Sequence, residues 1–117
     1  MKVNVLKEKS YRFALRVVKL FQFLSNDRKE YVLSRQILRS GTSIGANIEE
    51  AYQGESKADF IHKLAIANKE AFETHYWLRI FRDTSILEPI LAESLMADCD
   101  EIQRMLVAAI KTAKTRK

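Results

Sequence analysis

The chain has 117 residues, of which 47% are hydrophobic, which suits one compact domain, and its three Gly and one Pro argue against a many-stranded sandwich or barrel. The single cysteine, Cys99, excludes an internal disulfide and a multi-cysteine zinc site, and no apolar run approaches the roughly 18 residues of a membrane span. The formal net charge of +5 invites comparison with nucleic-acid-binding proteins, but four cations near the C-terminus account for most of it. We therefore expect an all-α protein of the cytoplasm with no membrane partner.

Apolar residues at helical spacing predict a first helix over about residues 5–24. Four cations recur at i, i+3, i+7 and i+10 on the side of this helix opposite its apolar stripe: Lys9, Arg12, Arg16 and Lys19. Such a stripe either follows the phosphates of a nucleic acid or is an ordinary solvated helix face. Both interpretations stay open from the sequence.

The second predicted helix, over about residues 31–53, carries short side chains where bulky ones would usually stand. Gly inside a helix costs about 1 kcal/mol relative to Ala, so another backbone is expected to approach this helix closely. We expect these residues to serve close packing and contacts between copies of the molecule, because helices two and three carry more apolar surface than one bundle core requires. The candidates are Ser40, Gly41, Ser43, Gly45, Ala46 and Asn47.

A third helix is predicted over about residues 57–83, after a stop at Gly54 and with Ser56 as its N-cap. Three of its basic side chains, those of His75, Arg79 and Arg82, fall beside the apolar stripe, so they need polar partners. The end of helix two offers such partners within or between subunits: Asn47, Glu49 and Glu50. The arrangement predicts either a clamp that fixes the register or a polar pore or ligand pocket.

Two aromatic residues of the third helix, Tyr76 and Trp77, have two possible uses. They either stack on nucleobases or pack in the core or between subunits, and aromatic residues dominate both cores and interfaces. Packing is the interpretation that we favour.

The fourth helix is predicted over about residues 87–113, with Pro89 in its first turn, where proline is tolerated. It leads into the basic C-terminal residues, which either contact phosphate or an acidic lipid surface or are a solvated helix end favoured by the helix dipole. These residues are Lys111, Lys114, Arg116 and Lys117. Four helices with short loops predict an antiparallel up-down-up-down four-helix bundle that forms a single domain over residues 1–117.

Three ordered segments support a more specific assignment: QILRSGTSIGANIEEA at 36–51, SKADFIHKLAIA at 56–67 and ETHYWL at 73–78. Together they resemble the four-helix-bundle proteins named after intervening sequences in bacterial 23S rRNA genes, over about residues 10–110 of this chain. The sequence departs from the family pattern at AYQGE, residues 51–55, and at NKE, residues 68–70.

The resemblance implies antiparallel four-helix subunits assembled into a ring of five. It also implies kinship with the accessory variability protein of diversity-generating retroelements, which works with a reverse transcriptase and binds nucleic acid through a basic surface.

The residues give little support to an enzyme. Asp59 and His62 have the i, i+3 spacing of a metal-binding pair, but they point away from the apolar stripe, and no second carboxylate-x-x-His pair completes an interior site. The sequence also lacks a nucleophile elbow and a Gly-rich phosphate loop. We expect no catalytic residues, no metal and no cofactor.

These observations predict a non-enzymatic homo-oligomer, with a pentamer favoured, that binds RNA or DNA through its cations with little sequence specificity. The alternative is a scaffolding module that recruits a protein partner and does not bind nucleic acid.

Overall fold

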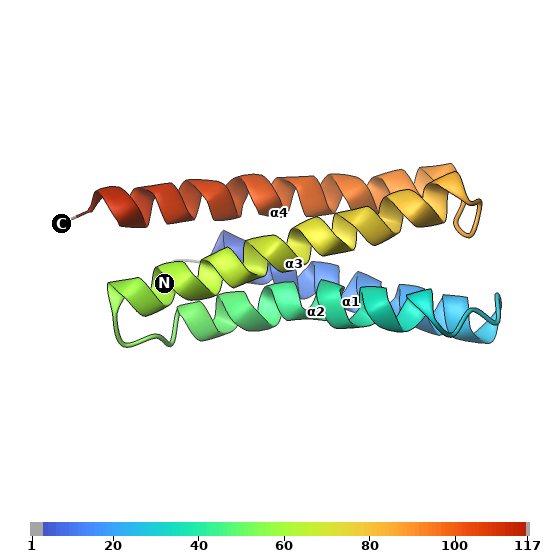
Figure 1. The fold of residues 1–117 in the computed structure, drawn as a ribbon, viewed down its shortest axis with the longest axis horizontal. Helices are drawn as coiled ribbons and strands as arrows, with labels where there is room; N and C mark the ends of the chain where they lie inside the picture. The colour runs from blue at the N-terminus through green and yellow to red at the C-terminus, as the bar shows by residue number, and fades with distance from the viewer. Residues whose placement is uncertain (1–3, 117) are drawn as a thin grey trace.

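The computed structural model describes residues 4–116, which form four helices joined by short turns (Figure 1). The helices are α1 (Val5–Asn26), α2 (Leu33–Ala51), α3 (Lys57–Asp83) and α4 (Pro89–Thr115). The chain reverses direction at each turn, and residues 4–116 contain no β-strand. The predicted all-α four-helix bundle is confirmed. None of the described helices is long and apolar enough to cross a membrane.

Residues at the N-cap and first positions define where three of the helices begin. Asn4 accepts a hydrogen bond from the backbone N–H of Lys7 at 3.0 Å, which caps α1. Ser56 caps α3 in the same way, by accepting from the N–H of Asp59 at 3.0 Å. α4 begins at Pro89, whose missing N–H removes one of the donors that would have no partner in the first turn. All observed helix bounds lie within two residues of the predicted ones.

α2 begins two residues later than predicted, because the side chain of Glu30 organises its first turn. The carboxylate accepts hydrogen bonds from the backbone N–H groups of Val32, Leu33 and Ser34 at 2.7–3.2 Å. These donors have no partner inside the helix, and a negative charge at a helix N-terminus is favoured by the helix dipole. A glutamate one turn before the helix therefore takes the role that a capping serine has in α3.

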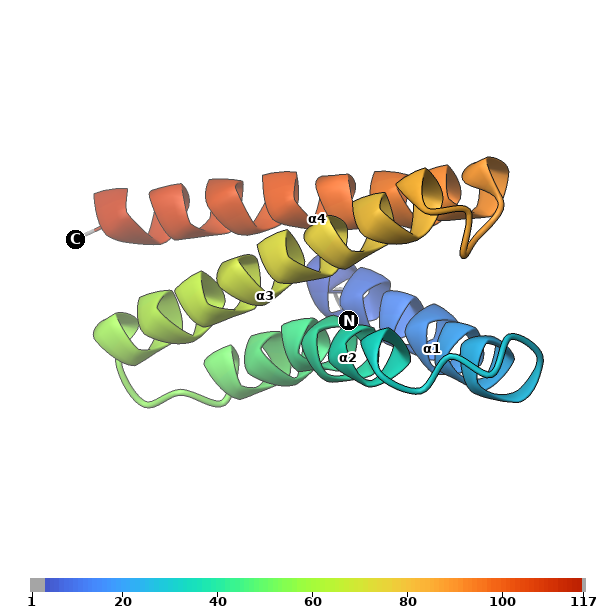
Figure 2. The same cartoon turned by 45° about the vertical axis from the view of Figure 1, so that its right-hand side comes forward.

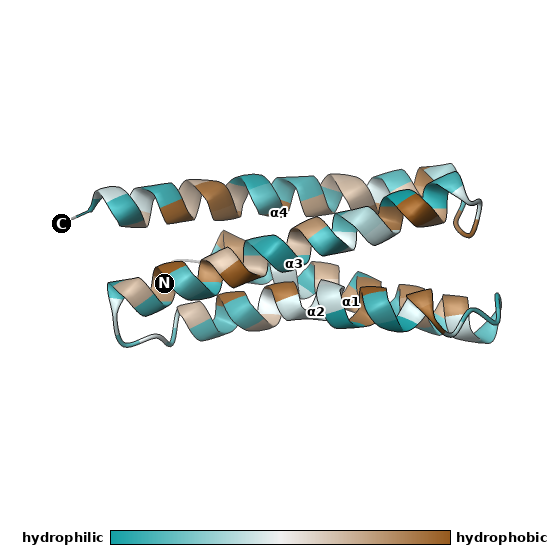
Figure 3. Ribbon diagram, viewed as in Figure 1, coloured by the Kyte–Doolittle hydropathy of each residue, from teal (hydrophilic) through white to brown (hydrophobic). Residues whose placement is uncertain are grey.

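The core is a continuous column of apolar side chains from all four helices. Figure 3 shows hydrophobic and hydrophilic residues alternating along each helix, as expected for helices that bury one face. Burying one leucine, isoleucine or phenylalanine side chain stabilises the fold by about 1.5–3 kcal/mol. Among the fully buried large side chains are Phe13, Leu24, Ile37, Ile48, Leu64, Phe81, Leu95 and Leu106.

α1 packs closely against α2 and shares a smaller interface with α4. In Figures 1 and 2, the start of α1 lies beside the middle of α4. The two helices then diverge toward the C-terminal end of α1. α4 therefore continues past the first turn of α1. Its last turns lie beside the end of α2 and the start of α3.

Candidate functional site

Three of the four cations in the α1 stripe are held by carboxylates of the same chain. The pairs are Lys9–Glu101, Arg12–Glu8 and Arg16–Asp98. The Arg16–Asp98 pair has an N–O distance of 2.6 Å, and it joins α1 to α4, as the Lys9–Glu101 pair does. Lys19 forms no ion pair within residues 4–116. Two of these pairs thus connect α1 to α4, and a role of the stripe in phosphate binding stays a prediction.

The cations at the end of α4 have a different environment. Lys111, Lys114 and Arg116 are all exposed, and their side chains form no ion pair with any residue that the structure describes. Lys117 lies outside the described residues. Lys57, at the start of α3, donates a hydrogen bond to the backbone carbonyl of Arg116 and so adds another cation to this end of the bundle.

A groove of about 630 Å³ lies at this end of the bundle, where α4 continues past α1; we call it the end groove. Tyr52 and Phe60 contribute its aromatic side, with ring centroids 5.2 Å apart in an edge-to-face arrangement. Lys57 and Arg116 also line it. Small side chains of α4 complete it: Ala108, Ala109, Thr112 and Ala113. Tyr52 is 40% exposed, so its ring is accessible.

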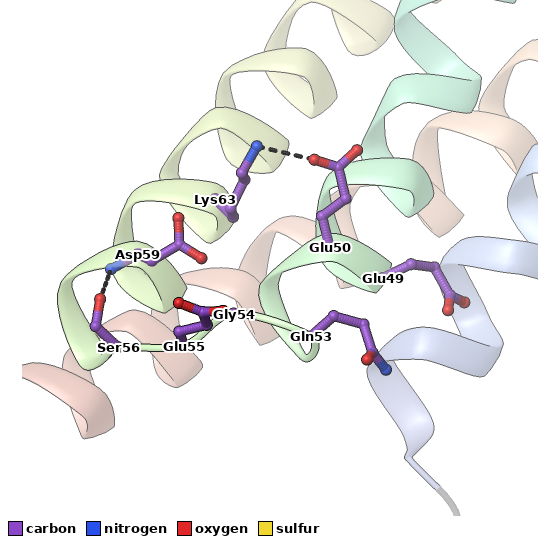
Figure 4. A pocket seen from close by; sticks show the side chains of 8 residues that line it. All are labelled: Glu49, Glu50, Gln53, Gly54, Glu55, Ser56, Asp59 and Lys63. Atoms are coloured by element: carbon purple, nitrogen blue, oxygen red, sulfur yellow. Dashed lines mark hydrogen bonds and ion pairs between the residues drawn. The ribbon is translucent and has the colours of Figure 1, made fainter.

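The other side of the α2–α3 turn carries a pocket of about 680 Å³ with the opposite charge (Figure 4). Its carboxylates come from Glu49, Glu50, Glu55 and Asp59. Lys63 neutralises one of them through a bond of 2.8 Å to Glu50. Lys7 lies 3.5 Å from Glu49, so the carboxylates of Glu55 and Asp59 are the ones in this pocket without an ion pair among residues 4–116. Within residues 4–116 no three His, Cys, Asp or Glu side chains are grouped so that they could hold a metal ion.

The close approach predicted for α2 is made by helices of the same chain. A Cβ on Gly41 would lie 2.7 Å from a methyl carbon of Val17 in α1, and a Cβ on Gly45 would lie 3.4 Å from the backbone oxygen of Ser10. Ser40 faces α3 and accepts a hydrogen bond from the buried hydroxyl of Thr74 at 2.9 Å. Ser40, Gly41 and Gly45 are therefore packing residues inside the subunit, and the expectation that copies of the molecule meet at these three positions is corrected.

The other short residues of α2 stay nearer the surface. Ala46 is exposed, whereas Ser43 and Asn47 are half-buried. The Ser43 hydroxyl donates to the carbonyl of Arg39 at 2.6 Å, and the Asn47 amide donates to that of Ser43 at 2.8 Å. A role for these three residues between subunits stays a prediction.

The clamp predicted between the end of α2 and the second half of α3 does not form within the chain. Because α2 and α3 are antiparallel, Glu50 lies beside Lys63 near the start of α3. His75 instead faces α4, with its Nε2 3.3 Å from Asp100. The other predicted members also have different neighbours: Lys7 for Glu49, Asp83 and Glu93 for Arg82, and the Tyr76 ring for Arg79. A contact of Glu50 or Arg79 with another subunit stays a prediction.

An ion-pair network that the sequence analysis missed joins α2 to α3. Arg39 lies 2.5 Å from Glu73 and 3.3 Å from Glu70, and Trp77 donates its indole N–H to Glu73 at 3.1 Å. The hydrogen bond from Arg39 is the main cause that lowers the pKa of Glu73 below its usual range. The i, i+3 spacing of the two glutamates was a usable signal, but nothing in the sequence assigned Arg39 to them.

Comparison with known proteins identifies the family. The chain matches the 23S rRNA-intervening sequence protein family over residues 2–108. It belongs to this family. A crystal structure of a protein with unknown function from the S23 ribosomal protein family of Bacteroides thetaiotaomicron VPI-5482 is 55% identical to it, with a TM-score of 0.91, and the match covers 95% of this chain and 99% of the other. No protein of curated function matches the chain.

The two aromatic candidates of this 23S rRNA-intervening sequence protein have different environments. Trp77 is half-buried and packs against the core. Tyr76 is exposed, and one turn before it Phe72 is 67% exposed, so the outer face of α3 carries two accessible aromatic rings. α1 has a comparable apolar outer face, formed by Tyr11, Leu15 and Val18. The family member thus presents two separate apolar faces.

Proposed function

We propose that this 23S rRNA-intervening sequence protein is a non-enzymatic homo-oligomer of the cytoplasm, with a ring of five subunits as the favoured assembly, and that it binds nucleic acid. The observation that carries the proposal is the group of exposed, unpaired cations on the last turns of α4: Lys111, Lys114 and Arg116. Arg116 also lines the end groove, and none of the three lines the acidic pocket.

The mechanism is electrostatic. Each phosphate that a cation neutralises releases counterions, so affinity falls steeply as salt rises. A ring repeats the same few cations in every subunit, and simultaneous contacts along one strand raise the overall affinity. Phosphate contacts carry no sequence information, so we expect weak sequence preference.

Assembly is supported by the accessible apolar faces. Phe72 and Tyr76 on α3 and the Tyr11, Leu15 and Val18 face on α1 lie on different helices. A ring requires two different, complementary surfaces on each subunit, because each copy contacts its two neighbours through opposite faces. Exposed apolar patches of this kind mark protein contacts.

The environment of Cys99 supports a role other than catalysis. Burial, together with the nearby Asp100 carboxylate, raises the pKa of the Cys99 thiol to about 12. A thiolate is the nucleophilic form, so this cysteine is a poor nucleophile at neutral pH. Its side chain instead donates to the buried carbonyl of Ala71 at 3.1 Å.

The test measures binding of labelled RNA and DNA 20-mers by fluorescence anisotropy at low and moderate salt. Replacing Lys111, Lys114 and Arg116 with Gln is expected to weaken binding. It should also lower the slope of log affinity against log salt concentration, by the equivalent of at most three phosphate contacts per subunit. The matched control replaces Arg12, Arg39 and Arg82 with Gln. This control removes the same charge from cations that carboxylates already neutralise, so it should change binding much less.

The alternative function is a scaffold that recruits a protein partner. Its support is the exposed Phe72 and Tyr76 pair, if a different protein covers it. Absence of oligonucleotide binding even at low salt would reject the nucleic-acid proposal and favour the scaffold.

A further inference from the structure

We infer that the end groove receives an unpaired nucleobase, so that this protein prefers single-stranded nucleic acid to duplex. The inference rests on the proposed nucleic-acid role and adds to it a site and a substrate class. Its central contact is a base stacked on the exposed ring of Tyr52.

The groove exists because α4 is longer than the part of α1 that covers it. The ion pairs Lys9–Glu101 and Arg16–Asp98 fix an antiparallel register in which the first turn of α1 lies beside the middle of α4. Both ribbon views show α4 continuing past that turn (Figures 1 and 2). The uncovered turns keep small side chains, including Ala109 and Ala113, and thereby leave a recess of about 630 Å³.

The recess combines an aromatic ring with polar groups. Tyr52 is 40% exposed and packs edge-to-face with Phe60, with ring centroids 5.2 Å apart, so this contact restricts the orientation of its ring. Thr112 provides a hydroxyl that can donate to or accept from a base edge. Base stacking on an aromatic side chain tolerates every base, because each base has a π face.

The charges around the groove favour a polyanion. Lys57 and Arg116 line the groove itself, whereas Lys111 and Lys114 lie on other faces of the same turns of α4. A strand whose base enters the recess places its phosphates beside Lys57 and Arg116. In a duplex the bases are stacked and paired, so only the phosphates can engage, and the contribution of Tyr52 is lost.

The experiment compares a labelled single-stranded 20-mer with the corresponding duplex, by fluorescence anisotropy at low salt. Wild-type protein is expected to bind the single strand more tightly. Tyr52→Leu should weaken single-strand binding about fivefold or more and leave duplex binding unchanged, whereas Tyr52→Phe keeps the stacking ring and should bind as wild type. Tyr31→Leu is the matched control, because Tyr31 is also exposed but lies in the turn between α1 and α2.

A second variant fills the recess without changing the ring. Ala113→Leu is expected to cause the same selective loss of single-strand binding, and far-UV circular dichroism checks that each variant is folded. Equal affinity for single strand and duplex, or an unchanged affinity in both Tyr52→Leu and Ala113→Leu, would overturn the inference while leaving the electrostatic proposal intact.

Two further results would overturn the inference for other reasons. If neither oligonucleotide binds wild-type protein at low salt, the proposed function itself has failed. If an acidic peptide, poly-glutamate, binds and loses affinity in Tyr52→Leu by the same factor as the single strand, the groove accommodates acidic chains in general and is not a base site.

Discussion

α1 approaches two glycines of α2 at different distances. At Gly41 a Cβ would lie 2.7 and 2.8 Å from the two methyl carbons of Val17, a β-branched side chain that is fully buried. At Gly45 a Cβ would be 3.4 Å from the nearest atoms of Ser10, which is an ordinary contact distance. The two positions lie four residues apart on one helix, so they form a matched pair for mutation.

We predict that Gly41→Ala destabilises the protein and that Gly45→Ala does not. Overpacking a core typically costs about 1–3 kcal/mol, while replacing Gly by Ala in a helix gains up to about 1 kcal/mol. The net change should be a loss at Gly41 and a small gain at Gly45. Urea unfolding followed by circular dichroism measures both free energies of unfolding. Equal changes in the free energy of unfolding would show that the closer approach of α1 at Gly41 does not affect stability.

These glycines also show what the sequence could reveal at single residues. The propensity cost of Gly was enough to predict that something packs closely against α2, but not that α1 does so at Gly41 while α3 meets Ser40. The same limit applies to Arg16. Its positive charge was evident, but its neutralisation by Asp98 depends on a contact between residues 82 positions apart in the chain.

At the scale of elements, local signals located the helices well. The cap at Ser56 and the proline at position 89 fixed the starts of α3 and α4 within two residues. The start of α2 was less predictable, because its cap is the side chain of Glu30, which reaches forward to Ser34. The end groove could not be predicted, since it depends on how far α4 continues past α1.

The ion pairs between α2 and α3 make stability depend on pH. The pKa of Glu73 is lowered in the folded protein from an ordinary value of 4.5, chiefly by the hydrogen bond from Arg39. A lowered carboxyl pKa contributes stability that is present above the unfolded value and is lost as pH falls through the folded one. The contribution should therefore be intact at pH 6 and absent well below pH 4.5.

We predict that Arg39→Met reduces the loss of stability between pH 6 and pH 3. The pair is largely exposed, so the difference should be a few tenths of a kcal/mol to about 1 kcal/mol. Urea midpoints at the two pH values measure it. Arg35→Met is the control, because Arg35 is exposed on the same helix and forms no ion pair within residues 4–116. If both variants keep the wild-type pH dependence, the Arg39 network does not contribute to it.

At the scale of the whole molecule, the expected oligomerisation depends on whether other copies cover the apolar faces of α1 and α3. The bundle is elongated, with extents of 50 × 26 × 20 Å, so long strips of α1 and α3 face outward. Phe72 is 67% exposed on one strip, and Leu15 is 48% exposed on the other. Leaving both in water would be unfavourable, which is the physical reason to expect assembly.

We predict that Phe72→Glu lowers the assembled mass measured by size-exclusion chromatography with light scattering. The substitution places a charge where the neighbouring copy would bury an aromatic ring, and burying an unpaired charge is costly. Folding should be unaffected, because Phe72 is exposed in the subunit and Glu is a good helix former.

The matched control for this prediction is Ile90→Glu. Ile90 is 83% exposed in the first turn of α4, outside the apolar strips of α1 and α3. It introduces the same charge at an apolar surface position, so a general effect of charge on solubility would appear in both variants. An assembled mass that falls only in Phe72→Glu would locate a subunit contact on α3. An oligomer that persists in Phe72→Glu would contradict a subunit contact at the Phe72 side chain. A wild-type protein that is already monomeric would contradict the ring of five subunits and the affinity gained from repeated subunits.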